Sequence, residues 1–258
     1  MLNRCRLIPR KIHMGEMMKT LKILSVMLCY PQSDMQMALD EMAEVLEQEN
    51  LVPERQRWAV QDLMRKMAQT DLMELQERYV RLFDRGRALS LHLFEHIHGE
   101  SRDRGQAMVN LLHIYQQHGF SLNIRELPDY LPLFLEYLAQ RPLTEALNML
   151  GEAMHVIALL SARLAERGSD YHVIFDALSA LVGEPADISD IRQQVAQEGP
   201  DPSVVNMDKL WEEEAVTFLA SQDDCAGRHL GPDMAQPLQW RSHAASEPSL
   251  TLRPMHAR

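Results

Sequence analysis

Apolar residues along this chain recur at the spacing of α-helices, and the alternation typical of β-strands is almost absent. The clearest case is a stripe in which apolar or small residues return every three or four positions: Leu143, Leu147, Leu150, Met154, Ile157, Ser161 and Leu164. Pro142 suits the first turn of such a helix, because a first-turn residue needs no amide donor. The pattern predicts a single helix over 142–167 with one buried face.

Short polar side chains and glycines mark further helix ends. Ser33, Asp71 and Asp103 each stand three residues before a glutamine or glutamate, which is the spacing of a capping box at a helix N-terminus. Gly119 and Gly168 follow helical stretches and predict stops, because glycine readily adopts the left-handed conformation that ends many helices. These signals predict an all-α, single-domain bundle of about nine or ten helices with disordered termini.

The two ends of the chain differ from the helical middle. The apolar run over 23–30 is too short and too polar for a secretory signal, so we predict a first core helix there and a disordered or misannotated extension over 1–16. Glycine, proline and acidic residues over 183–206 predict a linker around one weak helix. A last helix is predicted over 206–219. The folded domain is therefore expected to span 17–222, with a disordered tail over 223–258.

The overall charge restricts the possible partners. A formal net charge of -11 argues against a nucleic-acid binder, since neutralising phosphates needs clustered lysine and arginine, and an acidic surface suits a basic partner segment. The three cysteines, Cys5, Cys29 and Cys225, are far apart and form no Cys-x-x-Cys pair. Neither a disulfide framework nor a cysteine zinc site is indicated, and no apolar run approaches the length of a transmembrane helix.

Three histidines, His92, His96 and His98, are the first place to look for metal chemistry. His92 and His96 are four residues apart and are predicted to share a helix face. The pattern is not that of a zincin, because the glutamate does not directly follow the first histidine but precedes His96. We interpret all three as ordinary helical histidines. A metal-dependent hydrolase built on them remains the alternative.

Two Asp-Arg-Gly triplets flank these histidines, in the segments FDRGRALS (83–90) and GESRDRGQAM (99–108). Guanidinium groups beside glycine amides could hold an anionic group, because they pair with phosphate through two parallel hydrogen bonds. The interleaved carboxylates favour a second interpretation, in which arginine pairs with acid inside the protein and fixes helix ends. The residues concerned are Asp84, Arg85, Arg87, Arg102, Asp103 and Arg104.

The segment RELPDYLPLFLEYLAQ (125–140) combines two prolines with three aromatic residues. Because proline disfavours a helix interior, we predict that a helix starts near Pro132 after an extended lead-in. The resulting irregular aromatic surface, with carboxylates nearby, could receive a basic peptide. Plain core packing is the alternative, and the residue pattern does not decide between the two.

Taken together, these segments closely resemble the NarJ and NarW family, the delta subunit of respiratory nitrate reductase. The resemblance rests on FDRGRALSLHLFEHIHGESRDRGQAM, on RELPDYLPLFLEYLAQ, and on VIALLSARLAER, IFDALSAL and WEEEAVTF further along. It covers roughly residues 18 to 220.

The resemblance implies an all-helical fold of the TorD type and a cytoplasmic chaperone with no catalytic activity of its own. Such a protein binds the unfinished catalytic alpha subunit of nitrate reductase, including its N-terminal segment. It promotes insertion of the molybdenum bis-guanine-dinucleotide cofactor before membrane docking, and holds no cofactor permanently. The alpha-beta complex and molybdenum cofactor biosynthesis proteins are further partners to consider. A different molybdoenzyme client is the alternative within the family.

From this implied role and from surface chemistry, we expect the client peptide to contact Tyr79, Phe83, Leu127, Asp129, Tyr130, Phe134, Glu136 and Tyr137. The two Asp-Arg-Gly triplets are candidate client or cofactor contacts. We also expect that protonation of the three histidines near pH 6 weakens the binding of a basic peptide, because each adds positive charge.

Overall fold

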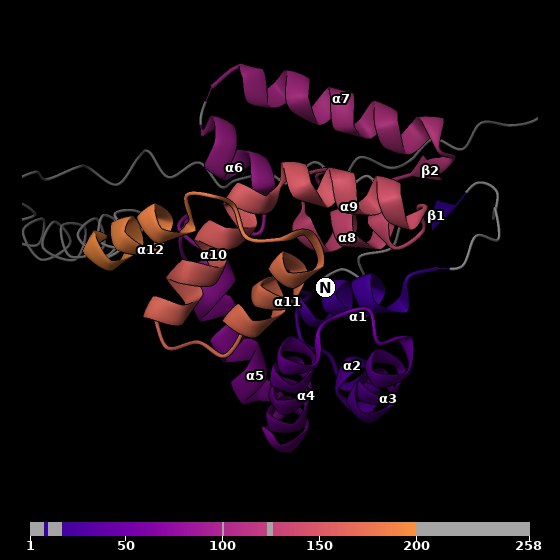
Figure 1. Ribbon diagram of the computed structural model, residues 1–258, viewed down its shortest axis with the longest axis vertical. Coiled ribbons are helices and arrows are strands. Elements are labelled where there is room, and N and C mark those ends of the chain that lie inside the picture. The colour runs from indigo at the N-terminus through magenta and orange to yellow at the C-terminus, as the bar shows by residue number, and fades with distance from the viewer. Residues whose placement is uncertain (1–7, 10–16, 100, 123–125, 200–258) are drawn as a thin grey trace, which may run out of the picture. The chain divides into compact units, whose positions relative to one another are not determined.

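The computed structural model describes residues 8–9, 17–99, 101–122 and 126–199 (Figure 1). Its helices are α1 (Lys19–Met27), α2 (Ser33–Met37), α3 (Leu39–Glu49), α4 (Glu54–Gln69), α5 (Leu72–Tyr79), α6 (Leu93–His98), α7 (Asp103–Gln117), α8 (Leu131–Leu138), α9 (Leu143–Glu152), α10 (Met154–Glu166), α11 (His172–Val182) and α12 (Ile188–Gln197). A π-helical turn, η1 (Val80–Asp84), continues α5, and two short strands are β1 (Ile8–Pro9) and β2 (Phe120–Ser121). The helix predicted over 206–219 and the tail predicted over 223–258 lie outside the described residues.

The all-α prediction is confirmed, with one small addition. β1 pairs with β2 in antiparallel register, Ile8 opposite Ser121 and Pro9 opposite Phe120, and this is the one sheet within the described ranges. It ties a dipeptide of the N-terminal extension, expected to be disordered, to the turn after α7. The helix expected within 183–206 is α12, whose Ile191 and Val195 pack against α10.

The predicted single helix over 142–167 is wrong. The chain breaks at Ala153, and α9 and α10 are bent by 66° relative to each other. Gly151 weakens the last turn of α9, because glycine gives up the most conformational freedom in a helix. A Cβ at this position would approach Val182 Cγ1 of α11 to 3.4 Å, so the glycine also leaves room for α11. By length and composition, this bent pair is the one candidate membrane span among the described helices, and no single helix qualifies.

A similar break separates α2 from α3 at Ala38, where φ and ψ are −90° and −3°. These interruptions explain why the described residues hold twelve α-helices rather than the nine or ten predicted. Among the predicted caps, only Asp71 is confirmed, since its carboxylate accepts from Met73 N at 2.9 Å. Ser33 and Asp103 lie inside their helices as first residues and do not act as caps.

α8 is the central helix of the core. All of its residues are buried, and α1 packs along it. The amide of Met18 donates to Ala139 O at 2.8 Å, and Ser25 Oγ donates to Pro132 O at 2.6 Å, so backbone and side chain both join the two elements. A helix that is apolar almost all round is stable only when covered on every side. Its one acid, Glu136, is paired with Lys22.

Other described helices pack against one another around α1 and α8. α10 packs against α11 and α12, and α11 packs against α4 (Figure 1). α7 lies over α8, where the rings of Tyr115 and Tyr137 approach to 4.6 Å between centroids. Gly119 and Gly168 end their helices with φ of +83° and +64°, as predicted from the preference of glycine for this region.

Candidate functional site

The two sequence motifs meet where α6 and α8 begin. Leu93 N donates to Asp129 O at 3.0 Å, and Leu131 N donates to Leu91 O at 2.8 Å. These bonds form an isolated antiparallel bridge between His92 and Tyr130. The extended lead-in predicted before Pro132 is therefore confirmed, and it pairs with the segment that enters α6. We call residues 91–94 together with 127–131 the α6–α8 junction.

Asp129 is the buried centre of this junction. Its side chain has no solvent exposure, accepts from Phe94 N at 3.1 Å and contacts His92 Nδ1 at 3.2 Å. Phe94 lies in the first turn of α6, so Asp129 satisfies an amide that has no partner within the helix. A carboxylate at this end also interacts favourably with the helix dipole. Asp129 thus fixes the start of α6 from a distant point in the sequence.

The three histidines do not converge on one point. His92 has extended backbone and precedes α6, so the prediction that it shares a helix face with His96 is wrong. His96 Nε2 lies 2.8 Å from Ser90 O, and the His98 ring packs edge-on against Phe94. Among the residues that the structure describes, no group of three His, Cys, Asp or Glu side chains is placed to hold a metal ion. The hydrolase alternative therefore has no donor set in this part of the chain.

His96 makes folding sensitive to acid. Burial lowers the pKa of His96, and the charge of Arg163 acts in the same direction, although the Ser90 carbonyl opposes them. The unfolded chain, in which histidine titrates near pH 6.5, therefore binds more protons than the folded one as the pH falls. We expect the free energy of unfolding to decrease below about pH 6.5, by at most about 1.4 kcal/mol per pH unit from this group.

Urea denaturation of wild type and His96→Gln at pH 7.5 and 5.5 measures this contribution. Glutamine can still donate to Ser90 O but does not titrate, so the loss on acidification should be smaller in the variant. Equal losses in the two proteins would contradict the assignment. His96 is also a poor source of the positive charge expected to weaken peptide binding near pH 6, since burial opposes its protonation.

An aromatic cluster lies behind the junction. Tyr79 Oη donates to Leu28 O at 2.9 Å and lies 3.3 Å from Tyr130 Oη. The Phe83 ring contacts Tyr79 on one side, at 4.9 Å between centroids, and Tyr171 on the other, at 5.3 Å. The cluster therefore connects α5 and η1 with the junction and with the start of α11.

The aromatic surface predicted over 125–140 is mostly core. Six of the expected peptide contacts are buried: Tyr79, Phe83, Asp129, Phe134, Glu136 and Tyr137. The reason is the coverage of α8 by α1 and α7, which the local residue pattern does not reveal. Leu127 is 43% exposed and Tyr130 is partly exposed, so these two offer surface to a partner. Core packing, the alternative interpretation, describes the other six.

The two Asp-Arg-Gly triplets lie on separate elements. Asp84, the last residue of η1, is exposed, as are Arg85 and Arg87 after it, and burial of part of the Asp84 carboxyl raises its pKa. Arg102 and Asp103 are exposed at the start of α7.

Arg104, in contrast, is half-buried and pairs with Glu95 of α6 at 3.1 Å. Burial opposes ionisation of Glu95, but a hydrogen bond from Ser90 and the Arg104 charge outweigh it and lower the pKa. Arg104 thus makes the intramolecular pair that we favoured, joining α6 to α7.

Two side chains that hold the junction carry no signal in the sequence. Ser90 donates to Glu95 and faces His96 through its carbonyl, and Tyr115 Oη donates to Pro128 O at 2.9 Å. The bond from Tyr115 fixes the proline lead-in to α8 from the neighbouring helix α7. No spacing in the sequence signals either contact, because both join elements whose packing is set by the tertiary fold.

Comparison with known proteins finds relatives named for nitrate reductase and its assembly. Residues 31–176 match the family described as "Nitrate reductase delta subunit". The nitrate reductase molybdenum cofactor assembly chaperone NarJ of Escherichia coli (strain K12) is 46% identical over 202 residues, which is 78% of this chain and 86% of that protein. The protein of the same strain described as "Probable nitrate reductase molybdenum cofactor assembly chaperone NarW" is 39% identical over 203 residues, which is 78% of this chain and 84% of that protein.

Among solved structures, a proposed redox enzyme maturation protein from Archaeoglobus fulgidus is similar at 20% identity and a TM-score of 0.44. The match covers 72% of this chain and 98% of that one.

Proposed function

The chain belongs to the nitrate reductase delta subunit family, and from this we propose that it is a cytoplasmic assembly chaperone for respiratory nitrate reductase. It binds the unfinished catalytic alpha subunit and promotes insertion of the molybdenum bis-guanine-dinucleotide cofactor before the complex docks at the membrane. It acts by binding and not by catalysis. The observation that carries the proposal is the 46% identity to NarJ over 78% of this chain, a span that extends well beyond any short motif.

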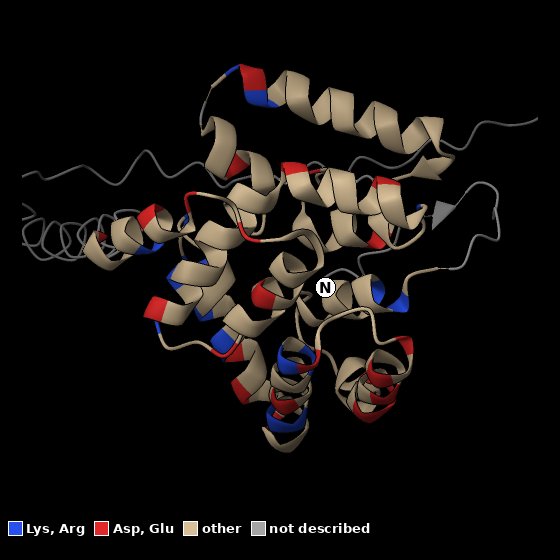
Figure 2. Cartoon of the chain, in the orientation of Figure 1, with Lys and Arg blue, Asp and Glu red and all other residues tan. Residues whose placement is uncertain are grey.

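We place the contact with the N-terminal segment of the alpha subunit on the exposed part of the α6–α8 junction. Leu127 and Tyr130 present apolar surface there, beside the His92 side chain, which is 28% exposed, and the partly exposed Phe94. The neighbouring helix α7 carries no Lys, Arg, Asp or Glu beyond its first turn, as Figure 2 shows. Leu127 and Tyr130 beside an uncharged helix suit a segment that buries apolar side chains.

The expected binding is moderate in strength. A segment that becomes ordered on binding loses conformational entropy, which burial of its apolar side chains must offset. The junction itself is held by buried hydrogen bonds through Asp129 and Tyr115, so little ordering is needed on the chaperone side. Binding of moderate strength also allows the alpha subunit to leave the junction once the cofactor is inserted.

Isothermal titration with a synthetic peptide from the N-terminus of the catalytic alpha subunit tests the proposal, with a scrambled peptide as control. We expect Leu127→Ser to weaken binding about fivefold, since the exposed part of a leucine contributes on the order of 1 kcal/mol when buried. Met37→Ser is the matched control, because Met37 is 79% exposed on α2, outside the junction. Its affinity should stay unchanged.

The possible outcomes distinguish recognition of the N-terminal segment from the position of its binding site at the junction. Equal weakening by Leu127→Ser and Met37→Ser would contradict the location at the junction. Failure of the native peptide to bind would contradict recognition of the N-terminal segment. In that case the folded alpha subunit, the alpha-beta complex and the cofactor biosynthesis proteins are the partners to titrate next. Tighter binding of the corresponding peptide from another molybdoenzyme would favour that enzyme as client.

A further inference from the structure

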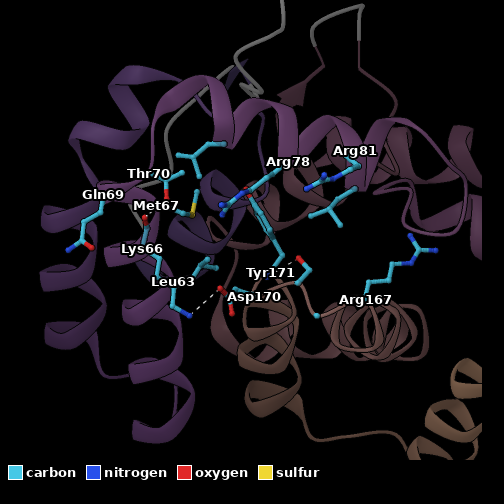
Figure 3. Close-up of a pocket in the computed structure, with 14 residues that line it drawn as sticks. Leu63, Lys66, Met67, Gln69, Thr70, Arg78, Arg81, Arg167, Asp170 and Tyr171 are labelled. Carbon is cyan, nitrogen blue, oxygen red and sulfur yellow. Dashed lines mark hydrogen bonds and ion pairs between the residues drawn. The ribbon is translucent and has the colours of Figure 1, made fainter.

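A cavity of about 830 Å³ lies away from the α6–α8 junction, between α4, the α5–η1 segment and the loop from α10 to α11. Its apolar floor consists of Leu63, Met67, Leu75 and Leu82. Cationic side chains surround this floor, namely Lys66, Arg78, Arg81 and Arg167. Figure 3 shows Arg78 and Arg81 on one wall and Arg167 on the other.

The positive charge of this cavity is unusual for a chain whose formal net charge is -11. One carboxylate, Asp170, lines it and contacts Lys66 Nζ at 3.1 Å. Arg78 is paired with Glu74 on the same helix. Arg81 and Arg167, in contrast, have no acidic partner within the described part of the chain, so two guanidinium groups remain available to a ligand.

A buried hydroxyl in the same cavity also lacks a partner. Tyr171 is only 6% exposed, and its Oη makes no hydrogen bond although it is removed from solvent. Figure 3 shows its side chain between Arg78 and Asp170. Buried polar groups in folded proteins are almost always hydrogen-bonded, so an orphan that lines a cavity points to a ligand atom as its missing acceptor. Burial raises the pKa of Tyr171, which keeps the hydroxyl protonated as a donor.

We propose that this cavity binds a small molecule that carries a phosphate or diphosphate group. Guanidinium groups pair with phosphate oxygens through two parallel hydrogen bonds, and the Tyr171 hydroxyl can donate to a further oxygen. The volume lies within the usual range for small-molecule sites, and the apolar floor accommodates the uncharged part of such a ligand. This inference goes beyond the chaperone function and does not depend on it, because none of these residues belongs to the junction.

Calorimetric titration of the full chain with inorganic pyrophosphate at low salt tests this site. The double variant Arg81→Gln and Arg167→Gln should bind at least about tenfold more weakly, because it loses two charge-assisted contacts. Tyr171→Phe should bind about three- to fivefold more weakly, as expected for one neutral hydrogen bond. Its melting temperature without ligand should be equal or higher, since phenylalanine removes an unsatisfied buried hydroxyl.

Arg55→Gln is the matched control, because Arg55 is exposed on α4 and does not line the cavity. Its affinity for pyrophosphate should stay within about twofold of wild type. The proposal is overturned if wild type releases no heat with pyrophosphate, or if Arg55→Gln weakens binding as much as the double variant. It is also overturned if a glutamate-rich peptide binds as tightly as pyrophosphate, since the cavity would then recognise negative charge in general.

Discussion

Replacing Asp129 by alanine is expected to lower the free energy of unfolding by about 3 kcal/mol. The side chain is fully buried, and its removal leaves Phe94 N without an acceptor and His92 without its carboxylate. An unsatisfied buried donor loses the full desolvation energy, which exceeds the net value of a typical hydrogen bond. The start of α6 should loosen first, because this is where Asp129 replaces an intrahelical partner.

Urea denaturation measures this effect, with Asp129→Asn as the matched variant. Asparagine keeps an acceptor for Phe94 N but loses the charge, so its loss should be about half as large. A wild-type stability in Asp129→Ala would contradict the structural role of this carboxylate. The comparison also governs how peptide binding is interpreted, because weaker binding by Asp129→Ala can follow from a distorted junction without any direct contact.

The sequence predicts where most of the helices lie, but not which other helices bury them. Proline geometry places the start of α8 correctly, since Pro132 is tolerated only in a first turn. The burial of α8 is a different matter. Tyr137 and Phe134 look like an aromatic surface along the chain, yet α1 and α7 cover them from segments far away in sequence. The local residue pattern shows on which face of a helix a side chain lies, but not which element packs against that face.

The break at Ala153 shows a second limit. A stripe of apolar residues with helical spacing continues through Gly151 to Leu164, and nothing in that stripe distinguishes one straight helix from two bent ones. Gly151 lies close to Val182 of α11, and that neighbour is present only in the folded protein. The capping signals behave likewise, because only Asp71 has the backbone position that a cap requires.

The cationic cavity could not be predicted at all. Arg78 and Arg81 lie near acidic residues along the chain and resemble an ordinary charged helix face. Arg167 and Tyr171 come from a loop far along the chain, and only the packing of α11 onto α4 brings them to the same cavity. The family resemblance gives the function at the level of the whole protein, but it does not indicate which residues face solvent.

Replacing Phe83 by alanine is expected to be the most damaging change in the aromatic cluster, with a loss of about 3–4 kcal/mol in the free energy of unfolding. The ring is buried on η1 and packs against Tyr79 and Tyr171 at the same time. Alanine leaves a cavity between two aromatic rings, and the surrounding helices can close it only partly. The hydroxyl of Tyr79 should keep its bond to Leu28 O, because Phe83 takes no part in that contact.

The variant Phe83→Leu separates two contributions of Phe83 to stability, the volume that it fills and the aromatic contacts of its ring. Leucine fills most of the space, so its loss should stay below about 1.5 kcal/mol if packing volume dominates. Thermal unfolding of both variants together with pyrophosphate titration tells whether the cluster also positions Tyr171. If Phe83→Leu folds like wild type but binds pyrophosphate several-fold more weakly, the ring of Phe83 orients the Tyr171 hydroxyl in the cavity. If Phe83→Ala loses less than about 1 kcal/mol, the cluster is less tightly packed than its ring distances indicate, and the buried position of Phe83 would then be compatible with the peptide contact expected from the sequence.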